Sequence, residues 1–489
     1  MGHPELRQGP ARPDRAHRSR RRARALPQRA SGRRQLSGVT VGEGALRSIC
    51  DRALQAVDGD QAEVVVIARN AALTRFANAA IHQNVVSREA ELRVRVVRGT
   101  RVAMVTTDRL DDEGVRLVAR DASDLAKITP ENPTFGGLAG DRDLVPAPSA
   151  YVERTAEATP LDRARAAKQL CDAARGASLS AAGYVATNMQ ELAIANSLGV
   201  WAYSAATTSD AELAVLGDAG SGFAQRLSLD VRTLDIAGCA REAVDKAKAA
   251  QKPRDLAPGT YEVVLEPYAV RDLIAFLGSQ LTGNAVEEGR SFVTGKLGQK
   301  VTGDVTLVDD PFDPKGLPRG FDLEGQPSQR LTLIERGVAK AVVYDSQTAY
   351  RTGQKNTGHA LPPNPFQPAA PMHLRLEPGT KTREELIKES KRAVLITRFW
   401  YTRWVHQLRT IVTGMTRDGT FAIEDGEIAY PVKNFRFTQS YHDALGGTLG
   451  IGRDLSLLVP GEQFGLQVSS YRVPALRLGA FTFTGATQY

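Results

Sequence analysis

Histidine and cysteine are the residue types in this 489-residue sequence best suited to bind metals or to move protons near neutral pH. No histidine pairs with another histidine or with an acid at i, i+4 spacing in a predicted helix, so the spacing indicates no helical metal site. Three cysteines in separate apolar, helix-like stretches predict buried thiols in a reducing, cytoplasmic compartment. These residues are His3, His17, His82, His359, His373, His406, His442, Cys50, Cys171 and Cys239.

His359 is the histidine whose neighbours suggest a site. It stands in Thr357-Gly358-His359-Ala360, directly before the proline-rich loop at residues 361–371. A histidine in such a place is either a group in a cleft or a hydrogen-bonded loop residue, and the second interpretation is the simpler one. An autonomous hydrolase would need His359 to meet His373 or His406 and a nearby carboxylate, and no ligand spacing in the sequence predicts that meeting.

Three other stretches come near to ligand-binding motifs and miss their spacing. Gly289 and Gly295 are separated by five residues where a phosphate loop has four, and Leu297 stands where that loop has a magnesium-binding hydroxyl. The glycines of residues 446–452 run in the wrong order for a dinucleotide fingerprint and precede a predicted strand, which favours a turn. The acids of residues 309–313 lack the glycine and the later glutamate of a calcium loop, so we predict a solvated turn there.

The elements expected in the first half alternate between helices and antiparallel strands. A proline- and glycine-rich loop is expected at residues 129–150 and a linker at residues 251–259. The predicted helices cover residues 42–57, 110–128, 159–175 and 234–250, and the predicted strands cover 62–68, 72–78, 81–86, 91–97, 101–106 and the alternating stretch 181–229.

The second half is richer in predicted strands. One apolar helix is expected at residues 269–281, after a proline break at Pro267, and a second at 382–392. Strands are expected at 261–265, 331–335, 338–344, 421–424 and 427–430. The sequence therefore predicts an α+β fold, with a mixed N-terminal domain at residues 39–250, which combines an antiparallel sheet with helices, and a larger β-rich C-terminal domain at 251–489.

The net charge of +8 comes from the N-terminus. Residues 1–34 contain eleven arginines and two acids, which leaves the other 455 residues with a charge of about −1. Residues 1–38 have few large apolar side chains, so we predict a disordered, arginine-rich tail. The sequence has no run of 18 apolar residues, so no membrane span is expected.

Several segments, in order, resemble the TldD/PmbA family, whose members are described both as modulators of DNA gyrase and as metallopeptidases. In the first half they are LTRFANAAIHQNV (residues 73–85) and RVRVVRGTRVAMVTTDRLD (93–111). In the second half they are GRSFVTGKLGQKV (289–301), FDLEGQPSQRLTLIERGV (321–338), YDSQTAYRTGQKNTGHA (344–360), TRFWYTRWV (397–405), TGMTRDGTFAIEDGEIAYPVKNFRFT (413–438) and VPALRLGAFTFTG (473–485).

The resemblance implies one of two kinds of subunit. TldD-like members carry a His-Glu-x-x-x-His helix and a late cysteine that hold the metal, whereas TldE/PmbA-like members lack them and pair with the first kind. When the family's Gly-x(5)-Gly segment is laid on residues 289–295, the three motif positions fall on Ile274, Ala275 and Ser279. An isoleucine, an alanine and a serine do not supply a zinc site with a general base.

The resemblance therefore implies a non-catalytic TldE/PmbA-like subunit with no cofactor of its own, and zinc in a TldD-type partner. The implied substrate is an unfolded or short peptide that enters as an extended strand. Candidate peptide-cleft residues are Arg351, Thr357, Gly358 and His359. A gyrase- or DNA-associated binding role is the third alternative, and the nearly neutral charge beyond the tail argues against DNA.

Overall fold

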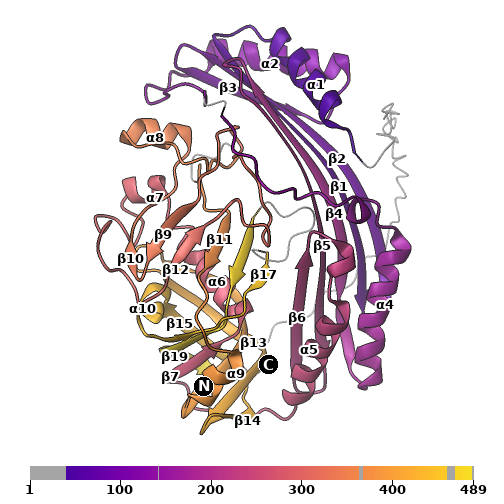
Figure 1. Ribbon diagram of the computed structural model, residues 1–489, viewed down its shortest axis with the longest axis vertical. Coiled ribbons are helices and arrows are strands. Elements are labelled where there is room, and N and C mark those ends of the chain that lie inside the picture. Colours follow the sequence, from indigo (N-terminus) through magenta and orange to yellow (C-terminus); the bar gives the residue numbers. More distant parts are fainter. Residues whose placement is uncertain (1–39, 141–142, 363–366, 460–468, 487–489) are drawn as a thin grey trace, which may run out of the picture. The chain divides into compact units, whose positions relative to one another are not determined.

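The computed structural model describes residues 40–140, 143–362, 367–459 and 469–486 (Figure 1). The tail predicted at residues 1–38 lies outside the described residues.

The first half folds into a six-stranded antiparallel sheet of unusually long strands. Its order is β3-β2-β1-β4-β5-β6, so β3 and β6 are the edge strands. The strands are β1 (Gln61–Ala77), β2 (Ala80–Arg98), β3 (Arg101–Thr107), β4 (Ser180–Asn196), β5 (Trp201–Leu216) and β6 (Ser221–Ser228).

Helices cover one face of this sheet (Figure 1). The apolar faces of α1 and α2 pack on one end of the sheet, and those of α4 and α5 pack on the other end. The opposite face meets the second half of the chain, because Val65, Ile67 and Ile194 share a buried cluster with Phe321 and Leu323. The helices of the first half are α1 (Glu43–Ala56), α2 (Asp112–Ile128), α3 (Glu153–Ala156), α4 (Pro160–Gly176), η1 (Val231–Thr233) and α5 (Ile236–Ala249).

The prediction of several short strands before residue 98 was wrong. Residues 62–68 and 72–78 belong to one strand, and residues 81–86 and 91–97 belong to the next. The polar Arg69 and Asn70 suggested a break between strands. They continue β1 because each pairs with residues of both β2 and β4, which satisfies the backbone on either side.

The second half contains a mixed sheet of short strands. Its order is β10-β9-β8-β11-β18-β17, with β11 and β18 parallel and the other neighbours antiparallel. The strand predicted over residues 338–344 ends at Ala339 in this sheet. The strands are β8 (Leu307–Asp309), β9 (Leu331–Glu335), β10 (Val338–Ala339), β11 (His373–Leu376), β17 (Ser456–Leu458) and β18 (Ser470–Val473).

A five-stranded barrel completes the second half. Because β12 pairs with both β7 and β13, the order β12-β7-β19-β15-β13 closes on itself. Alternating phenylalanines on two of these strands form its aromatic core, in which the Phe435 and Phe483 rings lie 4.4 Å apart. The strands are β7 (Thr260–Leu265), β12 (Arg392–His406), β13 (Ile411–Glu424), β15 (Phe435–Ser440) and β19 (Leu476–Ala486), and β14 (Glu427–Pro431) and β16 (Thr448–Ile451) pair with β13 and β19.

Helix α6 (Pro267–Gly278) lies between the mixed sheet and the barrel, and its apolar side chains join the core that both share. Pro267 separates β7 from α6, as predicted, but the helix begins at this proline and not at residue 269, because the missing N–H costs nothing in the first turn. The helix predicted over 382–392 is shorter, because residue 392 already begins β12. The other helices are α7 (Gly283–Glu287), α8 (Ser346–Thr352), α9 (Arg383–Lys388) and α10 (Tyr441–Gly446).

The α+β prediction is confirmed. The boundary predicted after residue 250 falls in the coil between α5 and β7 and stays a prediction. Among the described residues, no helix combines the length and the apolar character that crossing a membrane requires.

Candidate functional site

Helix α6 is the place where the family resemblance puts a metal-binding motif. Ile274, at the first motif position, is 1% exposed and packs in the core between Leu273 and Leu277. Ala275 packs against the same core, and the Ser279 hydroxyl donates to the Phe276 carbonyl oxygen at 2.7 Å. These three side chains therefore pack and cap the helix, and as a donor set they do not fit zinc. Among the described residues, no three His, Cys, Asp or Glu side chains gather as a metal site.

Asp272 is a buried acid on the same helix. Its two carboxylate oxygens accept hydrogen bonds from the Thr402 hydroxyl at 2.8 Å and from the Tyr441 hydroxyl at 2.9 Å. Burial raises the pKa of Asp272 and raises the pKa of Tyr441 well above its usual value. The carboxyl group thus ties α6 to β12 and α10. Its partners lie 130 and 169 residues away in sequence, so no local pattern could have identified them.

Arg351 lies on α8 and contacts the short helix that follows α6. Its guanidinium forms a bidentate ion pair with Glu287 of α7 and donates to the Asn284 side chain at 3.1 Å. The Glu287 carboxylate raises the pKa of Arg351 above its usual value. The structure therefore places this predicted cleft residue beside the segment that follows the α6 motif positions.

Thr357 and Gly358 fix the next loop to two neighbouring segments. The Thr357 hydroxyl accepts from the Tyr344 backbone N–H at 2.8 Å, and the Gly358 carbonyl accepts from the Ser328 hydroxyl at 3.2 Å. Gly358 has φ +70°, and a Cβ atom there would lie 2.0 Å from the Pro327 carbonyl oxygen. The glycine is needed for both reasons, since only this residue type tolerates the conformation and the close approach.

His359 is buried and hydrogen-bonded at both ring nitrogens. Its Nδ1 lies 2.7 Å from the Thr357 carbonyl oxygen, and its Nε2 lies 3.3 Å from a carboxylate oxygen of Asp309. The second Asp309 oxygen accepts from the His373 backbone N–H at 2.9 Å. The structure therefore brings His359 and His373 together around Asp309, whereas His406 lies at the exposed end of β12.

The solvated turn predicted at residues 309–313 was wrong. Asp309 is 0% exposed because it ends strand β8, which lies inside the mixed sheet between β9 and β11. Asp313 is also buried and forms ion pairs with Arg375 and Arg472. These partners come from β11 and β18, far along the chain, so the run of acids looked like a surface turn when only the sequence was considered.

Burial controls the charges of this histidine–aspartate cluster. It lowers the pKa of His373 to about 4, despite the opposing attraction of Asp309, so His373 is neutral at pH 7. Burial alone would raise the pKa of Asp309, but the hydrogen bond and charge of His359 bring it below its usual value.

A pocket of about 500 Å³ lies at the N-terminal end of α6, among residues of α5, β6, α9 and β17. Glu266, just before α6, is buried there between Lys246 at 2.5 Å and Arg383 at 2.7 Å. Burial would raise the pKa of Glu266, but these two cations lower it below its usual value. One edge strand of the long sheet, β6, and one of the mixed sheet, β17, each contribute three residues to the wall.

The fold defines a class of protein: an α+β chain with one long antiparallel sheet, a mixed sheet and a closed barrel. Family models of the PmbA/TldA metallopeptidase match residues 62–126 as domain 1, 153–251 as the central domain and 258–485 as the C-terminal domain. The chain belongs to the PmbA/TldD family of metallopeptidases.

Individual relatives agree with this assignment. A metalloprotease of Methanothermobacter thermautotrophicus is 28% identical over 236 residues, which cover 46% of this chain and 49% of that protein, so the chain spans about half of this relative. Metalloprotease PmbA of Escherichia coli O157:H7 is 22% identical over 409 residues, which cover 80% of this chain and 86% of the relative. The crystal structure of TldE from Thermococcus kodakarensis superposes with a TM-score of 0.82 at 19% identity, over 90% of this chain and 100% of that one, and shows a shared fold.

Proposed function

We propose that this chain is the non-catalytic, TldE/PmbA-like subunit of a two-component peptidase whose metal is held by a TldD-type partner. One observation carries the proposal: in a chain of a metallopeptidase family, the aligned motif positions on α6 hold a core isoleucine, an alanine and a helix-capping serine. A metal site at these positions would require a ligand-forming side chain in place of the buried Ile274. In this proposal the motif positions serve the packing and capping of α6 and bind no metal.

In this proposal the partner supplies the metal and the group that activates water, and this chain supplies part of the substrate chamber. The substrate is a short or unfolded peptide bound in extended form. The pocket between edge strands β6 and β17 supports this choice, because the unpaired edge of a sheet recognises a peptide through its backbone and with little sequence selectivity. Arg351, Thr357, Gly358 and His359 remain predicted cleft residues. In the structure each of the four is hydrogen-bonded to another segment of the chain, and Thr357 and His359 are buried.

The test compares the chain alone, a TldD-type relative alone and the two purified together. Zinc content is measured by mass spectrometry, and cleavage is measured with a fluorogenic unfolded peptide, with and without a chelator. We expect zinc and chelator-sensitive cleavage in the complex, a stoichiometric association of the two chains on gel filtration, and no cleavage by this chain alone. Chelator-sensitive cleavage by the purified chain alone would overturn the proposal.

The autonomous hydrolase remains the second candidate, because the structure brings His359 and His373 to the same carboxylate. The variant His359→Ala separates the two functions. An autonomous enzyme would lose cleavage while its folding, followed by circular dichroism, stayed near that of the wild type. A structural histidine would instead lower the stability of the chain, and any activity of the complex would fall in proportion to the folded fraction.

A further inference from the structure

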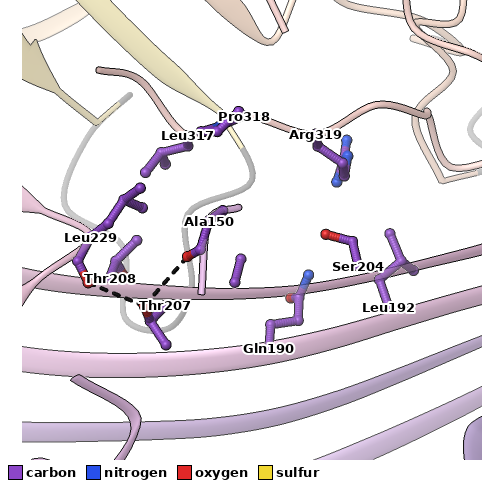
Figure 2. Close-up of a pocket in the computed structure, with 11 residues that line it drawn as sticks. Ala150, Gln190, Leu192, Ser204, Thr207, Thr208, Leu229, Leu317, Pro318 and Arg319 are labelled. Carbon is purple, nitrogen blue, oxygen red and sulfur yellow. Dashed lines mark hydrogen bonds between the residues drawn. The ribbon is translucent and has the colours of Figure 1, made fainter. Parts of the chain in front are cut away.

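A small cavity of about 30 Å³ lies between the long sheet and the loop at residues 317–319 (Figure 2). Strands β4 and β5 form its floor, and Leu229, Leu317 and Pro318 are among the apolar residues of its walls. None of the eleven lining residues is acidic. A water molecule needs roughly 10–15 Å³ of such volume, so the cavity has room for an occupant of about two waters.

Arg319 brings a positive charge to this cavity. Its Nε atom donates to the Phe321 carbonyl oxygen at 2.9 Å, and no carboxylate of the described residues lies within 4 Å of its guanidinium. Burial lowers the pKa of Arg319 to about 10, which still leaves the group charged at neutral pH. Arg319 is half-buried, and the charge that acts on it is the Asp322 carboxyl, which raises its pKa against the effect of burial. A bound anion within hydrogen-bond distance of the guanidinium would be a closer counter-charge.

Polar groups on the sheet face the same space as hydrogen-bond donors. The Gln190 side chain is 5% exposed, and its carbonyl oxygen accepts from Arg69 Nε at 3.1 Å, so its NH₂ group is the part left to bind an occupant. The Thr208 hydroxyl oxygen accepts from the Asn188 amide at 3.3 Å, which leaves its hydrogen free to donate. Figure 2 shows the Arg319 guanidinium, the Ser204 hydroxyl and the Gln190 amide turned toward the cavity.

We propose that this cavity binds a small monovalent anion of about the size of chloride, held between Arg319 and the donors of β4 and β5. The donors and the single cation fit an acceptor with one negative charge, and the volume excludes a bulky oxyanion. The anion would link the 317–319 loop to the sheet and would give Arg319 a counter-charge closer than Asp322. A terminal carboxylate of a peptide shares this chemistry, and the experiment distinguishes the two sources.

The experiment measures the melting temperature of the full chain at constant ionic strength in sodium chloride, in sodium bromide and in sodium gluconate, whose anion is too large for the cavity. Triglycine with a free carboxylate and triglycine amide are added in separate gluconate samples. A saturable rise of the melting temperature with a halide identifies a free ion as the source, and a rise with triglycine but not with its amide identifies a peptide carboxylate. Equal melting temperatures in all five conditions would overturn the proposal.

Two variants locate the response. Arg319→Gln, which can still donate to the Phe321 carbonyl, should abolish the anion-dependent rise, and Gln190→Glu should abolish it by placing a fixed carboxylate beside Arg319. The second variant should melt in gluconate no lower than the wild type, which shows that it folds. Arg330→Gln is the matched control, because Arg330 is about half exposed and lies outside the cavity, and it should keep the full response. A response that survives in Arg319→Gln, or a bromide-grown crystal without an anomalous peak beside Arg319, would also refute the site.

Discussion

Asp309→Asn is the substitution that most directly tests how the Thr357–His359 loop is held. The wild-type carboxylate accepts from His359 Nε2 at 3.3 Å and from the His373 backbone N–H at 2.9 Å, through different oxygens. An asparagine offers one oxygen, so one of these donors would face an NH₂ group. Hydrogen bonds to charged groups contribute about 1.5–3 kcal/mol each, so losing one and weakening the other should cost about 3 kcal/mol.

The assay is hydrogen exchange followed by mass spectrometry, together with urea unfolding. A cost of about 3 kcal/mol corresponds to an increase on the order of 100-fold in local opening, since 1.4 kcal/mol is tenfold. Faster exchange is expected in peptides that contain residues 357–360 and 373–376, while β1 and β4 keep their protection.

Asp304→Asn is the matched control, because Asp304 is largely exposed and its ion pair is with the exposed Arg336. If Asp309→Asn and Asp304→Asn gave the same exchange and the same urea midpoint, the structural role assigned to Asp309 would be refuted. Loss of a peptidase activity of the isolated chain, without any loss of stability, would instead favour the autonomous hydrolase.

Three further predictions concern other positions. In urea unfolding, Gly358→Ala should destabilise the chain by at least about 3 kcal/mol and Gly353→Ala by only about 1 kcal/mol. Both glycines have positive φ, but only Gly358 lies against a backbone carbonyl. Equal costs would show that the close approach does not matter. Tyr441→Phe should lower the free energy of unfolding by about 1.5–3 kcal/mol. A double-mutant cycle with Asp272→Asn should show less than additive effects, since the two side chains share a hydrogen bond. Full additivity would contradict that bond. Burial raises the pKa of Asp210 to about 7, so the folded state binds more protons than the unfolded state between about pH 4 and pH 7. The free energy of unfolding should therefore fall by up to about 4 kcal/mol as the pH rises through this window. Asp210→Asn should therefore flatten that dependence and raise the melting temperature at pH 8, and an unchanged pH profile in calorimetry would contradict it.

Local sequence patterns predicted an element well where the contacts that stabilise it come from residues near it in the sequence. Helix α4 is an example, since Thr159 and Asp162 form a capping box and Pro160 occupies the first turn, all within four residues. Strand β9 was also predicted with its observed bounds, Leu331–Glu335, beside its glycine-containing turn. Predictions failed where the strand partners are distant, as in the uninterrupted β1, whose polar centre is stabilised by pairing with β4 more than a hundred residues later.

The candidate site shows the same division. The sequence singled out Thr357, Gly358 and His359 from their composition, and the motif positions on α6 from a family resemblance. It gave no sign of Asp309, because an acid in a run of acids looks solvated until the neighbouring strands are known. Asp272 was equally hidden, since it is defined by two hydroxyl groups from other elements.

By itself the sequence determined the family, the α+β class and the residue types at the motif positions, because these depend on order along the chain and on local periodicity. Only the tertiary structure decided that Ile274 is core, that His359 and His373 share the carboxylate of Asp309, and that Arg319 meets the donors of β4 and β5 in one cavity. The physical reason is that burial and charge pairing arise between segments distant in sequence. The residue types at the motif positions on α6 can therefore be read from the sequence, whereas their packing can be seen only in the structure.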